Sequence, residues 1–537
     1  MGRKNTLPQP AAAAPVPAPP AEAPRPIAVV DMGASAIRLV VAEAASEGPV
    51  HILEEVSRGV LLGKDTFTHG RLGPATVEAT LKAMEGFRRI MDTYGVLRYR
   101  AVATSAVREA SNADAFLDRV RLRTGLEVEV IDGSEENRLS YVAVRDHLAD
   151  HPALTEGDAL LVEVGGGSAD ISFLRKGQPV HSGTYPLGAI RMRQSLGNWQ
   201  GSHEQGTRLL VRHIHNVVED IRREMPLKDA RHFIALGGDV RFAAGQIQGD
   251  VPEGQIHAFD RDAFVRFVDS VVAYDDEQLV ERYRLPQSEA ETLVPALLAY
   301  RELLLVTSAE HVISPDSSLR TGLLLDLARS DQPQGLEDFR KQVFSSAAAL
   351  GERYRYDAPH ARNVADLAGR LFDELRSEHG LSDRHRPLLE VAALLHDIGN
   401  YVNIRGHHEH SQYLIAASEI FGLSQDDMLL VSNVARYHRR AVPSKSHLPY
   451  MALDREARVA VNKLSAILRL ANALDADHLQ KVKDVHVLSE DDDWVLEVEG
   501  AGDLTMERLA SLARADYLTE VFGRKVTFRE SRQRPWP

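Results

Sequence analysis

Apolar residues in the first half of the chain gather in short runs that are separated by small-residue turns. Residues 27–32 lead through Gly33, Ala34 and Ser35 into a second apolar run at residues 37–42. A dinucleotide-binding turn would need a helix after its glycine, but the outgoing run is too short and too β-branched for one. The pattern therefore predicts a β-hairpin.

The same pattern returns about 130 residues later. Residues 159–164 lead through a Gly-Gly-Gly-Ser turn at residues 165–168 into residues 169–174, and a carboxylate again stands at the end of the first strand. Two such hairpins indicate an internal duplication. Each would head one half of a two-lobed α/β unit with a cleft between the halves.

The spacing of apolar positions predicts the elements around these hairpins. Helices are expected at residues 76–94, 113–124 and 204–224, and strands at 99–104, 127–131 and 233–236. From about residue 336 helical spacing dominates, at residues 339–356, 360–379, 387–398, 411–421, 426–437 and 456–475. Beyond residue 480 we expect strands at 485–488, 494–498 and 525–528 and a helix at 506–522.

These patterns divide the chain into five parts. Residues 1–26 form an Ala/Pro-rich tail that cannot build a core and is expected to be disordered. The two α/β lobes are expected at 27–150 and 151–330, followed by a linker at 330–335. An all-α domain at 336–480 and a small α/β domain at 481–537 complete the chain.

Composition narrows the possible chemistry. The 537 residues include no Cys, which excludes disulfides, thiolate metal sites and a Cys nucleophile. Lys and Arg number 63 against 77 Asp and Glu, so the net charge of −14 argues against non-specific binding to nucleic acid. With no apolar run of transmembrane length and no secretory signal, we expect a cytoplasmic protein without membrane insertion.

Both small-residue turns have the composition of phosphate-binding loops, because backbone N–H groups at such turns can converge on an anion. The residues concerned are Gly33 and Ser35 in the first turn and Gly165, Gly166, Gly167 and Ser168 in the second. Either turn alone is equally an ordinary hairpin turn. Two turns that each follow a carboxylate, Asp31 and Glu163, predict two facing phosphate sites with Mg²⁺ held between carboxylates and phosphate oxygens.

Two further segments contain candidate catalytic or phosphate-binding residues. Glu135 and Glu136 stand in the first turn of a helix that follows Asp132, where the macrodipole favours acidic residues. Both could be capping residues, or one could point into the cleft and act as general base on a water. The segment 104–112, which contains Arg108, could hold phosphate or simply cap a helix.

Polar residues interrupt apolar helix faces in the all-α domain and therefore need partners. A hard cation or zinc would satisfy four of them together, namely His360, His396, Asp397 and Asp475. Three more histidines, His408, His410 and His438, could extend this set toward a second metal or a phosphate. The basic residues Arg436, Arg439 and Arg440 form either a solvated face or a polyanion-binding patch.

With these motifs in view, the chain resembles the exopolyphosphatase / guanosine pentaphosphate phosphohydrolase (Ppx/GppA) family in its long form. The resemblance covers residues 27–537 and rests on several co-linear motifs: 30–33, 104–112, 131–139, 162–170 and 236–238, then 394–399, 408–411 and 437–439. It implies an actin-like two-lobed α/β fold of the sugar kinase–Hsp70–actin superfamily. An HD-type all-α domain and a small α/β domain are expected to follow it.

The resemblance also implies roles for single residues. The family's catalytic carboxylate maps to Glu136, and Asp31, Glu163 and Asp170 would hold or orient Mg²⁺. Arg38 and Arg108 would offset developing negative charge on the phosphate.

This chain departs from the family pattern in both loops. After Gly33, the family's usual Ser-Asn-Ser is replaced by Ala34, Ser35 and Ala36. In the second loop, Glu163 stands where the family usually has Asp, and Asp170 stands where it usually has Glu. Each exchange changes the reach of the carboxylate by one methylene, and an Mg²⁺ site demands near-ideal geometry.

The expected activity is Mg²⁺-dependent hydrolysis of the terminal phosphoanhydride of inorganic polyphosphate. A pppGpp 5′-phosphohydrolase is the first alternative, because the reacting anhydride is chemically alike. The altered loops motivate another alternative, a weakly active or non-catalytic sensor that binds polyphosphate or a nucleotide. A second divalent metal and a separate phosphohydrolase activity are open for the HD-type domain, and the resemblance implies a homodimer.

Overall fold

The structure, a computed structural model, describes residues 25–44, 50–195, 202–249, 256–329, 333–439, 441–490 and 493–530. The predicted tail lies almost wholly outside the described residues, as does Arg440. Arg25 and Pro26 already belong to the first strand, where they pair with Ala44 and Glu43. The tail, which was expected to extend to residue 26, therefore ends before residue 25. Residues 25 and 26 pair in the sheet through the backbone, which needs no apolar side chain.

The first lobe is built on a five-stranded sheet with the order β3-β2-β1-β4-β5. Its strands are β1 (Arg25–Met32), β2 (Ala36–Ala44), β3 (His51–Gly59), β4 (Arg98–Ala103) and β5 (Glu129–Val130). Helices α1 (Leu62–His69), α2 (Pro74–Thr93), α3 (Ser105–Arg108) and α4 (Ala113–Thr124) complete it. β1 pairs antiparallel with β2 and parallel with β4, so the predicted hairpin is confirmed.

The second lobe repeats this arrangement on a six-stranded sheet with the order β10-β11-β9-β6-β7-β8. Its strands are β6 (Asp158–Val164), β7 (Ala169–Arg175), β8 (Gln178–Tyr185), β9 (Ala230–Leu236), β10 (His257–Asp260) and β11 (His311–Ser314). Its helices are α6 (Pro152–Thr155), α7 (Ala189–Ser195), α8 (His203–Glu224), η1 (Leu227–Asp229), α9 (Gly238–Gln248), α10 (Arg261–Val272), α11 (Asp276–Tyr283) and α12 (Gln287–Leu305). Both lobes thus begin with three antiparallel strands and then add a parallel strand, as a duplication requires.

Two helices join the lobes. In α5 (Gly133–His147), Leu139 shares a core with β1 and β2, whereas Tyr141 and Val144 share a core with β6 and β9. Helix α13 (Leu319–Arg329) follows β11 in the chain but packs on α5 and β1. The segment 151–330, expected as one lobe, therefore returns to the first lobe at its end.

The rest of the chain shares one hydrophobic core that runs from Val343 to Val526. Its helices are α14 (Pro333–Arg353), α15 (Ala358–Glu374), α16 (Arg376–His379), α17 (His385–Leu395), η2 (Ile398–Tyr401), α18 (His407–Ala416), α19 (Gln425–Arg436), α20 (Leu448–Met451), α21 (Arg455–Ala473) and α22 (Thr505–Phe522). Strands β12 (Val482–Glu490), β13 (Asp493–Gly500) and β14 (Val526–Glu530) form a small sheet beside α22. We call residues 333–530 the helical domain. The all-α and small α/β parts expected from the sequence have no separate cores, because α21 packs on α22.

The helical domain contacts α5 directly. The ring of Phe421 packs edge-on against Tyr141 at a centroid distance of 5.4 Å. The backbone N–H of Gln425 donates to Asp132 Oδ2 at 2.9 Å, and the hydroxyl of Ser134 donates to the Leu423 carbonyl. The first turn of α5 therefore lies between the cleft and the helical domain. Within the described residues, every helix falls short of the length and apolarity that a membrane span requires.

Candidate active site

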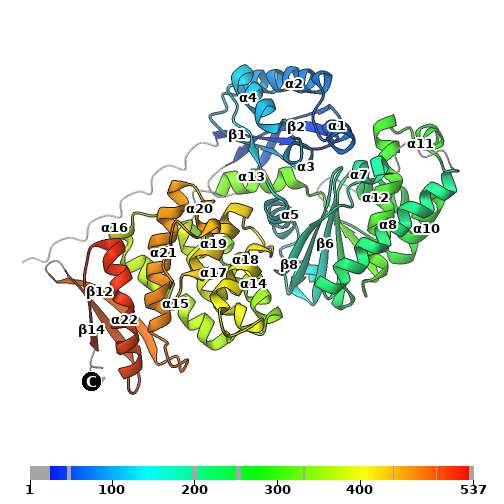
Figure 1. The fold of residues 1–537 in the computed structure, drawn as a ribbon. Coiled ribbons are helices and arrows are strands. Elements are labelled where there is room, and N and C mark those ends of the chain that lie inside the picture. The colour runs from blue at the N-terminus through cyan, green and yellow to red at the C-terminus, as the bar shows by residue number, and fades with distance from the viewer. Residues whose placement is uncertain are drawn as a thin grey trace, which may run out of the picture.

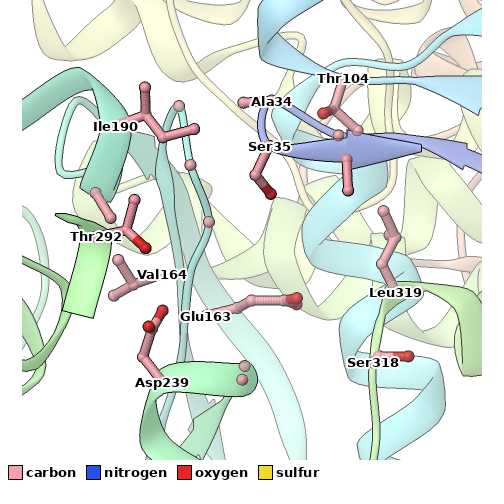
Figure 2. Close-up of a pocket in the computed structure, with 18 of the residues that line it drawn as sticks. Ala34, Ser35, Thr104, Glu163, Val164, Ile190, Asp239, Thr292, Ser318 and Leu319 are labelled. Carbon is pink, nitrogen blue, oxygen red and sulfur yellow. The ribbon is translucent and has the colours of Figure 1, made fainter. Parts of the chain in front are cut away.

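A cavity of about 620 Å³ lies between the two lobes. The β1–β2 turn, the β6–β7 turn and the first turn of α5 line it, together with the first turns of α9 and α13. Figure 2 shows Ser35 and Glu163 pointing into this space from opposite lobes, with Asp239 on α9 below them. Of the cleft residues expected from the sequence, all line the cavity except Arg108.

The two small-residue turns are built alike and approach each other closely. Gly33 N donates to Ala36 O at 3.1 Å, and Gly165 N donates to Ser168 O at 2.9 Å, which closes each turn. A Cβ added to Gly166 would stand 2.9 Å from the Ala34 Cβ, so only glycine fits where the loops meet.

Their remaining backbone amides are available to a ligand. In the described part of the chain, the N–H groups of Ala34, Ser35, Gly166 and Gly167 have no backbone acceptor. They border the cavity, and buried amide donors without an acceptor are costly unless water or a ligand satisfies them. The two loops thus offer facing sets of anion-binding donors.

Three carboxylates at the strand ends lie in the cavity wall, where Asp31 and Asp170 are buried and Glu163 is half-buried. Ser140 Oγ donates to Glu163 Oε2 at 2.5 Å, and Thr184 Oγ1 donates to Asp170 Oδ1 at 2.7 Å. Burial raises the pKa of Asp31, Glu163 and Asp170, and repulsion between neighbouring carboxylates adds to the shift at Glu163 and Asp170.

The structure separates the two glutamates of α5. Asp132 caps the helix by accepting from Glu135 N, which fixes the direction of the first turn. The Glu135 carboxylate turns away from the cavity and pairs with Arg100 at 2.8 Å and Arg138 at 2.7 Å. The Glu136 carboxylate lines the cavity, as the general-base interpretation requires.

Glu136 has the environment of a carboxylate that exchanges a proton near neutral pH. Arg108 Nη1 donates to its Oε1 at 2.7 Å, and the side chain of Glu136 is buried. Burial, together with the neighbouring charges of Glu163 and Asp31, raises the pKa of Glu136 to about 7 against the opposing effect of Arg108. A general base works best when its pKa lies near the operating pH.

The arginines of the site divide into two groups. Arg38 and Arg320 face the cavity and approach Asp31 Oδ2 at 3.8 and 3.7 Å, too far for direct hydrogen bonds. Arg108, expected at the phosphate, does not line the cavity, because its Nη1 is bound to Glu136 and to the Ile131 carbonyl. Arg108 is therefore placed to orient Glu136.

Several residues that line the cavity or hold its carboxylates were not expected from the sequence. Arg241 and Arg320 add positive charge to the wall, and Ser140 and Thr184 hold the strand-end carboxylates. Asp239 also lines the cavity, and burial with repulsion from Glu289 raises its pKa to about 7. Ser140 stands four residues after Glu136, one helical turn along α5, which is the single local signal that could have identified one of them.

The carboxylates present fit Mg²⁺. This ion prefers oxygen ligands and binds through one or two carboxylates together with phosphate oxygens. Asp31, Glu163 and Asp170 lie beside one another in the wall of a cavity that free amide donors also line. A cation among them would relieve the repulsion that raises the pKa values of Glu163 and Asp170.

This arrangement is matched by a known family. A model of the Ppx/GppA phosphatase family matches residues 39–331, more than half of the chain, and a model of Ppx/GppA phosphatase domain III matches residues 344–515. The chain belongs to the Ppx/GppA phosphatase family. Members of this family hydrolyse phosphoanhydride bonds, so the chain is an enzyme of that class.

Individual relatives are distant in sequence. Two curated relatives, each 22% identical, are named guanosine-5′-triphosphate,3′-diphosphate pyrophosphatase. The match to the Vibrio parahaemolyticus protein covers 78% of this chain and 81% of that protein, and the match to the Aliivibrio fischeri protein covers 87% and 92%. The crystal structure of an exopolyphosphatase from Cytophaga hutchinsonii is 22% identical with a TM-score of 0.53, over 57% of this chain and 98% of that one. That similarity supports the two-lobed fold.

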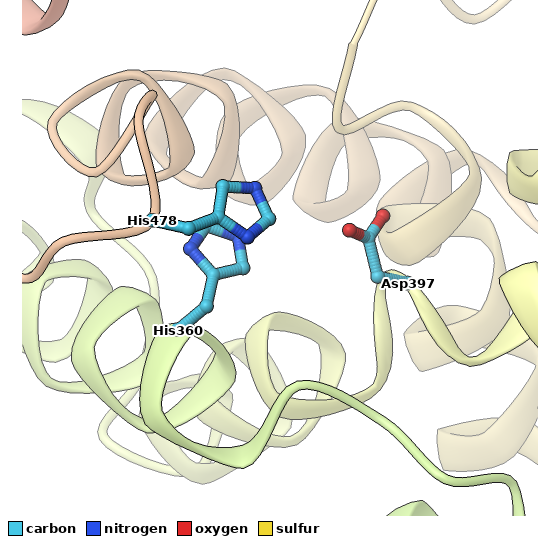
Figure 3. A group of neighbouring side chains, drawn as sticks. All are labelled: His360, Asp397 and His478. Atoms are coloured by element: carbon cyan, nitrogen blue, oxygen red, sulfur yellow. The ribbon is translucent and has the colours of Figure 1, made fainter.

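In this Ppx/GppA family member, the helical domain carries a second cluster of ionisable side chains. His360, His396 and Asp397 lie together, as the sequence predicted. Asp475 does not join Asp397 but stands behind His360, where its Oδ2 accepts from His360 Nδ1 at 2.7 Å. Figure 3 shows the stacked rings of His360 and His478 facing Asp397.

The remaining members of this cluster differ from the expected extension. His438 joins His396 and Asp397, but His408 and His410 do not, and His407 takes their place. His407 and His478 were missed because a single histidine in a sequence carries no sign of what it faces in the fold.

Proposed function

We propose that this Ppx/GppA family member hydrolyses the terminal phosphoanhydride bond of inorganic polyphosphate. The observation that supports the proposal most directly is the position of Glu136, whose buried carboxylate faces two loops of free amide donors across one cavity. A water held between this carboxylate and a phosphate bound by the loops would be in place to attack phosphorus.

Each residue then has a definite task. The amides of Ala34, Ser35, Gly166 and Gly167 bind phosphate oxygens, and Arg38, Arg241 and Arg320 balance their charge. Glu136 accepts the proton of the attacking water at its carboxylate, while Arg108 holds that carboxylate in position. Asp31, Glu163 and Asp170 would hold Mg²⁺, which supplies charge neutralisation at the phosphate when bound.

A direct test measures orthophosphate release from long-chain polyphosphate by the full chain with and without Mg²⁺. Glu136→Gln keeps the shape of the side chain and removes the base, and Glu135→Gln on the same turn is the matched control. We expect Mg²⁺-dependent release that Glu136→Gln lowers by about a hundredfold or more and Glu135→Gln retains. Polyphosphate binding without release would contradict the proposal and support a non-catalytic sensor.

A second candidate substrate is pppGpp. The cavity wall includes Phe242, Leu285 and Pro286, an apolar surface suited to a nucleoside and without use for a purely inorganic chain. The names of the two curated relatives favour the same substrate. Comparing phosphate release from pppGpp and from polyphosphate in the wild type and in Phe242→Ala separates the two, because loss of the ring should impair only the nucleotide reaction.

A further inference from the structure

Helix α5 presents one face to the cleft and another to the helical domain. Glu136 and Ser140 lie one turn apart, and both line the cavity. A second set of α5 side chains is spaced by three or four residues, which places it on one face of the helix. The members of this set that contact the helical domain are Ser134, Arg138, Tyr141 and Arg145. The helix that carries Glu136 is thus held from a side other than the one that faces the cleft.

These contacts come from two segments of the helical domain. On α14, Asp338 pairs with Arg145 at 2.8 Å, near the end of α5. The segment 421–425, which leads into α19, instead reaches the start of α5, where the hydroxyl of Ser134 donates to the Leu423 carbonyl. This second segment therefore lies at the turn that carries the proposed base.

One carboxylate joins the starts of two helices. Asp132 Oδ1 accepts from Glu135 N at 3.1 Å and caps α5. Its other oxygen, Oδ2, accepts from Gln425 N at 2.9 Å, and Gln425 is the first residue of α19. Helix N-termini carry free N–H groups and a partial positive charge, so both helices favour a carboxylate between them. Asp132 therefore connects α5 to the helical domain while it caps α5.

The same residue fixes the turn from which Glu136 projects. Glu136 N donates to the Asp132 carbonyl at 3.0 Å, so the main chain and the side chain of Asp132 hold two consecutive amides of this turn. Arg108 holds the Glu136 carboxylate from the first lobe. The direction of the base thus depends on two parts of the molecule: the first lobe through Arg108 and the helical domain through Asp132.

We propose that Asp132 is a positioning residue through which the helical domain sets the position of Glu136 in the cleft. The proposal rests on the function proposed above, in which Glu136 accepts the proton of the attacking water. A displacement of a reacting group by about 1 Å can lower a rate about a hundredfold, so a hydrogen bond at this turn controls turnover without touching substrate. The free amides of the two phosphate-binding loops stand on other turns, so the contact should affect kcat and leave KM nearly unchanged.

Residue 425 permits a change that removes only this hydrogen bond. Proline has no N–H and fits the first position of a helix. Ser424 is already extended, with φ −69° and ψ 165°, as a residue that precedes proline must be. Gln425→Pro therefore removes the donor to Asp132 without disturbing α19. Gln425→Ala is the matched control, because it keeps the N–H and changes only an exposed side chain.

Steady-state phosphate release by the full chain measures the effect. We expect Gln425→Pro to lower kcat about tenfold, as the loss of one charge-assisted hydrogen bond would, with KM within about twofold of the wild type. Gln425→Ala should match the wild type. In a Glu136→Gln background, Gln425→Pro should cause no further loss, because the base through which it acts is gone. An equal loss in that background, or a wild-type kcat in Gln425→Pro, would overturn the positioning role.

Asp132→Ser separates the two roles of the Asp132 side chain. Serine is as good an N-cap as aspartate, but its single side-chain oxygen is occupied by the cap of α5 and leaves Gln425 N without its acceptor. We expect the same loss of kcat, about tenfold, and the double variant with Gln425→Pro should be no worse than either single variant. Losses that multiply in the double variant would contradict a shared hydrogen bond.

Hydrogen exchange in the first turn of α5 tests the contact without any substrate. The amides of Glu135 and Glu136 should exchange faster in Gln425→Pro than in Gln425→Ala, since Asp132 holds both. A chain that shows this difference but releases no phosphate would contradict the proposed function and leave the link between the helical domain and Glu136 standing. A chain that releases phosphate but exchanges equally in both variants would overturn the role of Asp132.

Discussion

The cleft and the histidine cluster are both groups of ionisable side chains inside the protein, but their environments shift pKa values in opposite directions. The cleft gathers carboxylates, whose burial and mutual repulsion raise their pKa values. In the helical domain, burial lowers the pKa of His396 and His438, and the surrounding histidines lower the pKa of Asp397 against the effect of its own burial. The donor atoms therefore suit different cations: oxygen ligands for Mg²⁺ in the cleft and nitrogen ligands for a transition metal in the helical domain.

The two regions also differ in how the chain builds them. The cleft is lined by backbone groups at two turns that are related by duplication. The strand pairing within each hairpin therefore fixes the position of these groups. The histidine cluster draws side chains from helices α15 and α18 and from the residues that follow α17, α19 and α21, and its geometry depends on how those helices pack. A site built on turns is more readily predicted from sequence than one built on helix packing.

The largest expected effect is a loss of activity that follows from a change in the cleft alone. Glu136→Gln should lower kcat for phosphate release about 10²- to 10⁴-fold, because a general base contributes that much. KM should change little, since the phosphate-binding loops are intact. Steady-state kinetics beside Glu135→Gln checks this, and a similar loss in both variants would show that the helix, not the base, is responsible.

The next effect concerns the proton held by Glu136 in the metal-free protein. Its pKa is about 7 in the folded state and about 4.5 when unfolded. The folded state therefore binds this proton more tightly, and the stability that it contributes below pH 4.5 is lost as pH rises to about 7. Relative to the wild type, Glu136→Gln should become more stable over this range, by at most about 3 kcal/mol. Calorimetric melting at pH 5 and pH 8 without divalent metal measures the difference, and a pH-independent difference would contradict it.

Metal loading should stabilise only the region that binds it. Co²⁺ at about 100 times its Kd should stabilise the helical domain by about 2.7 kcal/mol, because binding to the folded state alone shifts the unfolding equilibrium. Thermal melting followed by hydrogen exchange in α15 and α18 localises the effect. The shift should persist in His410→Ala and vanish in Asp397→Asn.

The smallest effect probes the carboxylate set of the cleft. Ser140→Ala removes the hydroxyl that donates to Glu163, which should raise the pKa of Glu163 further and cost about 1 kcal/mol of stability. The Mg²⁺ concentration needed for half-maximal activity should increase, since Glu163 must lose its proton to bind the ion. An unchanged Mg²⁺ dependence would show that Glu163 does not hold the metal.

Sequence periodicity located elements where one face of the element is apolar. Helix α4 has the predicted bounds of 113–124, and both hairpins form as expected. Helix α18 was expected at 411–421 but spans His407–Ala416. Its buried face includes His407, Ser411 and Gln412, so a polar cluster rather than an apolar stripe holds the helix in place. Strand β3 was not predicted because its residues are mostly exposed.

The sequence by itself pointed to the two loops, to the Glu135–Glu136 pair and to the carboxylates of Asp31 and Glu163, because these groups lie within a few residues of turns that local composition identifies. The family resemblance favoured Glu136, and the tertiary structure shows that Glu136 and not Glu135 faces the cavity. Only the tertiary structure showed that Arg108 holds Glu136. The tertiary structure likewise brought Arg320 from α13 to Asp31 and placed Asp475 behind His360. Such contacts join residues far apart in the chain, and packing between elements, which no local pattern encodes, sets their distances.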